Sequence, residues 1–89
     1  MAWTIEFDPR AARALKKLDR TIRREIADFL HNRIAKAENP RRFGKPLKGL
    51  KFGLWRFRVR DYRIISRLRD DRLVVLVVEV GHRSTIYDD

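Results

Sequence analysis

The stretch Trp55–Leu68, which reads WRFRVRDYRIISRL, decides the fold because apolar and basic side chains alternate along it. In its first five residues the apolar side chains point to one face of a strand and the arginines to the other. Arg60-Asp61 then predicts a two-residue turn, and Tyr62–Leu68 predicts the returning strand. The stretch therefore predicts an antiparallel hairpin with one apolar face and one basic face.

The turn sets which side chains meet across the hairpin. With two turn residues, Val59 pairs with Tyr62, and Arg58 lies opposite Arg63 on the basic face. Like charges directly opposite each other are destabilising, and an anion bound between them would remove the repulsion. Two long side chains that spread into water would also reduce it at little cost. The pair is thus a candidate anion site or, alternatively, an ordinary solvated pair.

The segments on either side of the hairpin predict a loop and a further strand. Residues 40–53 carry two prolines and three glycines, which is typical of a loop, and we expect three apolar residues to anchor it: Leu47, Leu50 and Phe52. Asp70-Asp71 predicts a turn, and the apolar run Leu73–Val80 predicts a central strand covered on both faces. Gly81 is expected to interrupt this strand with a bend or bulge, before a last short segment over residues 83–87.

The N-terminal part predicts a strand and two helices. Residues 3–7 alternate as in a half-buried strand. Asp8 is a good N-cap and Pro9 favours the first helical position, so a helix begins there. Asp19 can cap a second, longer helix, whose apolar residues recur at spacings of three and four until Asn39-Pro40 ends it. A link this short predicts an antiparallel helical hairpin.

These elements predict one α+β domain over residues 1–89. Its order is an N-terminal strand, a helical hairpin and a three- to four-stranded, mainly antiparallel sheet. The helices are expected to cover one face of the sheet, and the arginines of the hairpin to look onto the other, partly bare face.

Charge is concentrated in the same part of the chain. The chain holds 22 lysines and arginines against 12 acidic residues, a net charge of +10. Residues 39–60 contain no acidic residue and eight basic ones, which are Arg41, Arg42, Lys45, Lys48, Lys51, Arg56, Arg58 and Arg60. A field of one sign favours a partner rich in phosphate, or an acidic protein, over an ordinary solvated surface.

Composition excludes several classes of protein. The chain has no cysteine, which excludes a disulfide scaffold and a thiolate metal site. The N-terminus lacks the pattern of a signal peptide, and the longest apolar run, Leu73–Val78, is far shorter than the about 20 residues that span a bilayer. We therefore expect a cytoplasmic protein with no membrane partner and no cofactor.

Four motifs occur in order along the whole chain: W-x-I-x-F at 3–7, L-x-G-L at 47–50, W-R-x-R-V-x-D-Y-R-I at 55–64 and V-G-H-R-x-x-x-Y at 80–87. Together they resemble the RelE toxin family of bacterial and archaeal type II toxin–antitoxin systems, in the RelE/ParE superfamily. The resemblance implies a microbial-RNase-like fold and an endoribonuclease, an mRNA interferase, that cuts mRNA in the A site of the 70S ribosome and so inhibits translation. It also implies an acidic, RelB-like antitoxin partner.

The resemblance further implies the site residues. The catalytic positions of the family fall on Arg56, Arg58, Arg63, Arg83 and Tyr87. The first two are often lysines in the best-known members, and here both are arginines, which stay protonated and suit phosphate binding rather than proton removal. The other basic residues of 39–60 are expected to bind RNA or the ribosome: Arg41, Arg42, Lys45, Lys48, Lys51 and Arg60.

Cleavage of RNA needs little beyond such residues, because the 2′-hydroxyl of RNA is itself the nucleophile and no metal is required. Tyr87 is the candidate general base, since surrounding arginines lower the pKa of a phenol. Arg63 would hold the scissile phosphate and Arg83 would stabilise the leaving oxygen. His82 is the alternative acid, because the ordinary pKa of histidine lies near neutrality. Alternation points His82 and Arg83 to opposite faces, and the resemblance favours Arg83.

Two other functions stay open at this point. One is a toxin of the same fold that poisons DNA gyrase, although that sister group generally lacks the arginine and tyrosine set. The other is a basic module that binds RNA or an acidic protein without cleaving anything, which accounts for the charge but leaves Tyr87 without a role.

Overall fold

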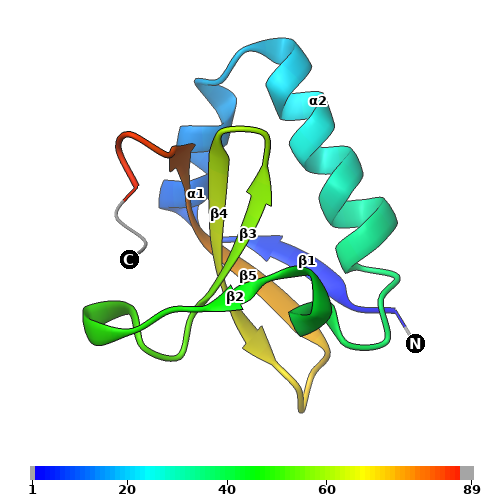
Figure 1. The fold of residues 1–89 in the computed structure, drawn as a ribbon. Coiled ribbons are helices and arrows are strands. Elements are labelled where there is room, and N and C mark those ends of the chain that lie inside the picture. The colour runs from blue at the N-terminus through cyan, green and yellow to red at the C-terminus, as the bar shows by residue number, and fades with distance from the viewer. Residues whose placement is uncertain (1, 87–89) are drawn as a thin grey trace.

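The computed structural model describes residues 2–86, which form one five-stranded mixed sheet with two α-helices against one face (Figure 1). The strands are β1 (Thr4–Phe7), β2 (Lys45–Pro46), β3 (Trp55–Val59), β4 (Tyr62–Arg69) and β5 (Val74–His82). They lie in the order β1-β5-β4-β3-β2, with β1 parallel to β5 and the other neighbours antiparallel. The predicted α+β class is confirmed. The strand that the sequence does not reveal is β2, because two residues are too short to show alternation.

Both helices begin where the sequence predicts. They are α1 (Pro9–Lys16) and α2 (Arg20–Phe29). The carboxylates of Asp8 and Asp19 accept hydrogen bonds from the backbone N–H groups of Ala11 (2.8 Å) and Thr21 (3.1 Å), as N-caps do. The first helix packs against β1 and β5 and the second against β3, so both cover the same face (Figure 1). No helix among the described residues is long and apolar enough to cross a membrane.

The second helix ends earlier than predicted. The α-helical pattern stops at Phe29, and Leu30–Ile34 form a π-helical turn in which the Ala35 N–H donates to the Leu30 carbonyl at 2.8 Å. The wider turn keeps both Leu30 and Ile34 buried, so the apolar spacing alone did not reveal it. Asn39 does not end this helix but caps a short 3-10 helix over Pro40–Phe43.

The last strand corrects a second expectation. β5 continues through Gly81 to His82, so the glycine does not interrupt it. The irregularity lies three residues earlier, at Val78, because Ile65 pairs with Glu79 but Ser66 pairs with Val77, which leaves one extra residue in β5. Gly81 is needed for a different reason: a Cβ there would lie 2.9 Å from Ile86 Cδ1. The glycine therefore admits a side chain from the C-terminal segment onto the sheet.

Apolar residues cluster on both faces of the sheet. Ile64 belongs to the large core beneath the helices, whereas the next residue, Ile65, packs with Leu47 and Ile86 in a small cluster on the opposite face. Of the three expected loop anchors only Leu47 is buried, at 3% exposure. Leu50 and Phe52 are exposed, and that prediction was wrong, because the backbone reverses at Gly49, whose φ is +62°.

Candidate functional site

The predicted hairpin register is confirmed. Val59 pairs with Tyr62 and Arg58 with Arg63, across a turn in which Arg60 takes a φ of 54°, a conformation rare for residues other than glycine. On β5, Gly81 lies next to Arg63, so a row of three positions crosses the sheet. These side chains point away from the helices, because their neighbours Phe57 and Ile64 belong to the core beneath the helices.

A second row follows on the same face. It consists of Arg56 on β3, Ile65 on β4 and Glu79 on β5. Arg56 and Arg63 are half-buried, and Arg58 is exposed at the sheet surface. The predicted catalytic arginines of the hairpin, Arg56, Arg58 and Arg63, therefore lie together on two adjacent strands, on the face of the sheet opposite the helices, here called the arginine face.

Arg83 joins this group from the far end of the chain. Its backbone N–H donates to the Asp61 carbonyl at 2.7 Å, and its Nε lies 3.8 Å from Asp61 Oδ1. These contacts hold Arg83 at the turn end of the β3–β4 hairpin, where Arg58 and Arg63 also lie. Ile86 fills the space above Gly81 on that face. The last predicted catalytic residue, Tyr87, lies outside the described residues.

His82 points to the other side of the sheet. Its ring packs edge-on against Tyr62 with the ring centroids 5.4 Å apart, and Tyr62 packs against the core beneath the helices. Its Nδ1 accepts a hydrogen bond from the Ser84 N–H at 3.1 Å and lies 2.9 Å from Ser84 Oγ. His82 therefore lies on the opposite side of the sheet from Arg58 and Arg63.

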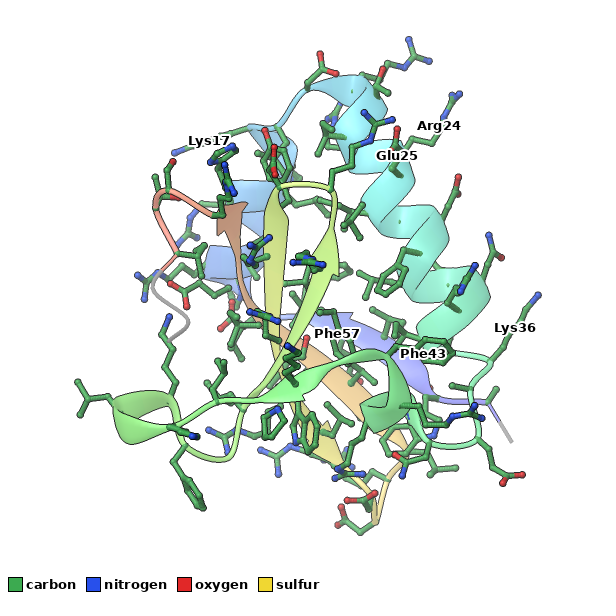
Figure 2. All side chains as sticks on the ribbon, in the orientation of Figure 1. Lys17, Arg24, Glu25, Lys36, Phe43 and Phe57 are labelled. Atoms are coloured by element: carbon green, nitrogen blue, oxygen red, sulfur yellow. The ribbon has the colours of Figure 1, made fainter. Side chains whose placement is uncertain are left out.

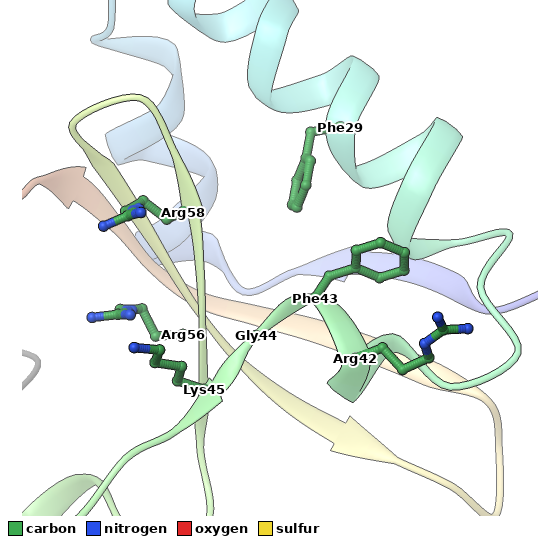
Figure 3. Close-up of a pocket in the computed structure, with 7 residues that line it drawn as sticks. All are labelled: Phe29, Arg42, Phe43, Gly44, Lys45, Arg56 and Arg58. Carbon is green, nitrogen blue, oxygen red and sulfur yellow. The ribbon is translucent and has the colours of Figure 1, made fainter.

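A cleft of about 350 Å³ opens beside β2 and β3 (Figure 3). It is lined by two aromatic residues, four cations and a glycine, namely Phe29, Phe43, Arg42, Lys45, Arg56, Arg58 and Gly44. Figure 3 shows Lys45, Arg56 and Arg58 extending to one side of the two strands, with Phe29 and Phe43 on the other. Gly44 is required here, since a Cβ would lie 2.9 Å from the Arg56 carbonyl oxygen. Cations beside exposed ring surface suit the phosphates and bases of RNA.

Sequence reasoning missed both phenylalanines of the cleft as site residues. Phe29 belongs to the apolar stripe of α2, where it cannot be told from a core residue. Phe43 lies between basic residues in the loop, and the sequence does not show whether its ring is buried. In the structure the ring is exposed.

Three of the six cations expected to bind RNA are held in ion pairs. Arg60 Nε lies 2.6 Å from Glu25 Oε1, and Figure 2 shows Glu25 on α2 beside the hairpin turn. Lys51 Nζ lies 2.9 Å from Glu79 Oε1, and Arg41 bonds Asp70 through both of its terminal nitrogens. These acids lie far away in sequence, so the one-signed stretch is partly neutralised only in the folded chain. Arg42 and Lys45 line the cleft, and Lys48 is exposed.

The ion pair of Arg41 and Asp70 changes the titration of both groups. Hydrogen bonding to the Arg41 guanidinium lowers the pKa of Asp70, and the same bond raises the pKa of Arg41. The Arg41 guanidinium also lies over the Trp55 ring, 5.6 Å from its centroid. Arg41 therefore braces the turn after β4 against β3, which is a structural role.

Comparison with known proteins identifies the class. Residues 5–87 match the family described as the ParE toxin of the type II toxin–antitoxin system parDE. Toxin RelG of Mycobacterium tuberculosis is 32% identical over 98% of this chain and 98% of its own length. The mRNA interferase toxin RelE of Escherichia coli is 30% identical over 100% of this chain and 94% of its own. The chain belongs to this family of type II toxin–antitoxin toxins, within the RelE/ParE superfamily, as its motifs predicted.

Solved structures of similar fold agree. The toxin–antitoxin complex RelBE2 of M. tuberculosis matches with a TM-score of 0.86 and 30% identity, covering 94% of both chains. The intact E. coli RelBE complex matches with a TM-score of 0.72 and 25% identity, over 91% of this chain and 96% of that one.

Proposed function

We propose that this toxin is an mRNA endoribonuclease that cleaves mRNA in the ribosomal A site and thereby inhibits translation. The observation that carries the proposal is the meeting of Arg58 and Arg63 across the hairpin, with Arg83 held at the same end of the sheet. The hairpin and the C-terminal segment thus bring three cations to one end of the sheet, and a cluster of cations favours a ligand that carries phosphates. The similarity to a protein named mRNA interferase toxin RelE supports the same reading.

The proposed reaction is an in-line attack of the 2′-oxygen on the neighbouring phosphorus. The bond from the 2′-oxygen to phosphorus forms while the bond to the 5′-oxygen breaks, which leaves a cyclic phosphate and a 5′-hydroxyl. Arg58 and Arg63 bind the phosphoryl oxygens and stabilise the charge that develops on them, with Arg56 in the next row as a further contact. None of these arginines removes a proton, because a guanidinium stays protonated at any relevant pH.

The proton steps fall to the C-terminal segment. We assign proton removal from the 2′-hydroxyl to the phenolate of Tyr87, on the strength of the family resemblance. Arg83 donates hydrogen bonds to the departing 5′-oxygen, which takes its proton from water. General acid–base catalysis contributes typically 100- to 10,000-fold, so loss of one such group is readily measured.

The ribosome would complete the site. On the arginine face Asp61 and Glu79 lie beside Arg83 and Lys51, and Glu6 lies on β1 at the far edge of the sheet, so these carboxylates are poorly placed to act as bases. A set of mainly cationic groups binds the phosphate well but does not by itself align the attack. Alignment of reacting groups supplies a large part of many rate enhancements, and a decoding ribosome holds the codon in a defined path. This favours ribosome-dependent and metal-independent cleavage.

We further propose that a cognate antitoxin controls the activity. It is expected to be acidic, RelB-like and to carry an amphipathic helix that covers exposed apolar surface and the arginine face. The charge of this chain supports such a partner, and so does the similarity to toxins solved in RelBE complexes.

The test is to map mRNA ends in translating ribosomes after expression of the toxin and of three alanine variants, at Arg58, Arg63 and Arg83. Each variant should lower the cleavage rate by about 100-fold or more, the scale seen when one stabilising donor is removed. Arg13→Ala, an exposed arginine on α1, is the matched control and should cleave normally. Free mRNA without ribosomes is the second arm and should remain uncut.

Three outcomes would contradict the proposal. Unchanged cleavage and growth arrest in the Arg63 and Arg83 variants would remove the catalytic assignment. DNA breaks without loss of mRNA would favour the gyrase poison. RNA binding with a steep salt dependence and no cleavage would favour a simple binding module.

A further inference from the structure

The loop between β2 and β3 presents two large apolar side chains to solvent. Leu50 is 107% exposed and Phe52 83%, far more than any other large apolar residue that the structure describes. Figure 1 shows this green segment projecting beyond the edge of the sheet, on the side away from α2. In so small a domain, apolar residues that could have packed on the core but do not are typical of a contact surface.

Backbone hydrogen bonds close and brace this loop. Its two ends are joined by a hydrogen bond from the Leu47 N–H to the Leu54 carbonyl at 2.9 Å, and Leu47 is buried. Within it, the Lys51 N–H donates to the Lys48 carbonyl at 3.2 Å and the Phe52 N–H to the Gly49 carbonyl at 3.1 Å. Phe52 is therefore presented on a closed, braced turn, so that binding through its ring would cost little additional ordering.

The loop is also tied to the arginine face. Lys51 Nζ lies 2.9 Å from Glu79 Oε1, and Glu79 belongs to the same row across the sheet as Arg56. Leu47 packs with Ile65, the middle residue of that row. A strand of RNA bound by the arginine pair therefore has this loop as its next neighbour along the face.

Charge and shape select the partner. The loop lies in a stretch with no acidic residue, and Lys45 and Lys48 beside it are exposed. A partner helix needs a trough in which to bury its apolar face, whereas Leu50 and Phe52 project from a tight turn. An exposed ring in a loop that also carries exposed lysines matches the unpaired bases of single-stranded RNA, which stack on aromatic side chains while cations contact the phosphates.

We propose that Phe52 stacks on an unpaired base of the mRNA strand that flanks the cleavage site, with Lys48 on the adjoining phosphate. This rests on the proposed function and adds to it a second RNA contact outside the arginine face. Stacking accepts any base, so the contact would strengthen binding without choosing a codon.

The test measures binding of a labelled single-stranded RNA oligonucleotide to the isolated toxin by fluorescence anisotropy. Phe52→Ala should weaken binding by about 5- to 150-fold, the range for loss of one base stack. Phe52→Trp should restore it, and Leu50→Ala, which removes an even more exposed apolar side chain without a ring, is the matched control with less than about 3-fold effect. Thermal unfolding should be unchanged in all three, because both positions are exposed.

Several results would overturn the inference. Equal binding by wild type and Phe52→Ala would do so, as would equal losses for the Leu50 and Phe52 variants, which indicate plain apolar docking. If Phe52→Ala bound the oligonucleotide normally but lost affinity for empty 70S ribosomes, the loop would be a contact for ribosomal RNA. If it lost affinity only for the antitoxin, the loop would be a contact for the antitoxin. Failure of the proposed function looks different: wild type would then bind the oligonucleotide but cut no mRNA on ribosomes.

Discussion

Replacing Gly81 with alanine would place a methyl group where Ile86 packs on the sheet. The new Cβ would lie 2.9 Å from both Cδ1 and Cγ1 of Ile86 and 3.2 Å from Thr85 Oγ1. The backbone itself tolerates alanine, since the φ of Gly81 is not in the left-handed region. The damage should therefore come from overpacking alone, and Ile86, only 8% exposed, would have to move.

The magnitude follows from two opposing effects. Overpacking of a buried site costs typically about 1–3 kcal/mol. Alanine in a strand gains about 0.5–1 kcal/mol over glycine, because the unfolded chain loses less entropy on folding. The net loss in the free energy of unfolding should be at most about 2.5 kcal/mol. Ile86→Ala alone should cost about 2–4 kcal/mol, as for other buried isoleucines.

The double variant separates overpacking from any other cause. With Ile86 shortened, the methyl group at position 81 has room, so the two losses should not add, and the double variant should be no less stable than Ile86→Ala alone. Urea unfolding followed by tryptophan fluorescence gives all four free energies, and the expected coupling is about 1–3 kcal/mol, which is the overpacking cost that the double variant relieves. Strict additivity within about 0.3 kcal/mol would refute the reasoning, because the two side chains would then not contact each other.

Three further predictions concern single side chains. Ser66 is fully buried and its Oγ has no hydrogen-bond partner among the described residues, so Ser66→Ala should raise the free energy of unfolding by about 1 kcal/mol in urea titrations; a loss of that size would reveal a partner. The pKa of Asp70 is lowered by its hydrogen bond to Arg41, so the stability it contributes is present above the unfolded pKa of about 3.9 and is lost as pH falls through the folded value. Because the pair is exposed, Asp70→Asn should cost at most about 0.5 kcal/mol at pH 7 and nothing at pH 2, and an equal cost at both values would contradict this. Finally, Arg60 forms an ion pair with Glu25 of α2, so Arg60→Ala should weaken binding of an RNA oligonucleotide less than Lys48→Ala does. A larger loss for Arg60→Ala in anisotropy titrations would show that the ion pair does not keep Arg60 from binding RNA.

Local patterns predicted a large part of this structure. The alternation of Trp55–Leu68 and the two-residue turn gave the register that brings Arg58 and Arg63 together, because pairing across a tight hairpin depends only on neighbouring residues. The N-caps at Asp8 and Asp19 could be predicted for the same reason, because each cap bonds a backbone N–H two or three residues further along the chain. The sequence was less reliable where one residue type fits two structural roles. Gly81 within a strand indicated a bend or bulge, but in the structure the glycine makes room for the Ile86 side chain, and the bulge lies elsewhere in β5.

By itself, then, the sequence determined the order of the elements, the basic hairpin and the toxin family, since these depend on short-range spacing. The tertiary structure alone decided which cations stay available to a ligand, because their acidic partners come from distant parts of the chain, such as Glu25 for Arg60. It also decided that Phe29 and Phe43 line the same cleft and that Phe52 stays outside the core. An apolar residue looks the same in sequence whether it is buried or exposed, and only the packing of the remaining chain determines which of the two occurs.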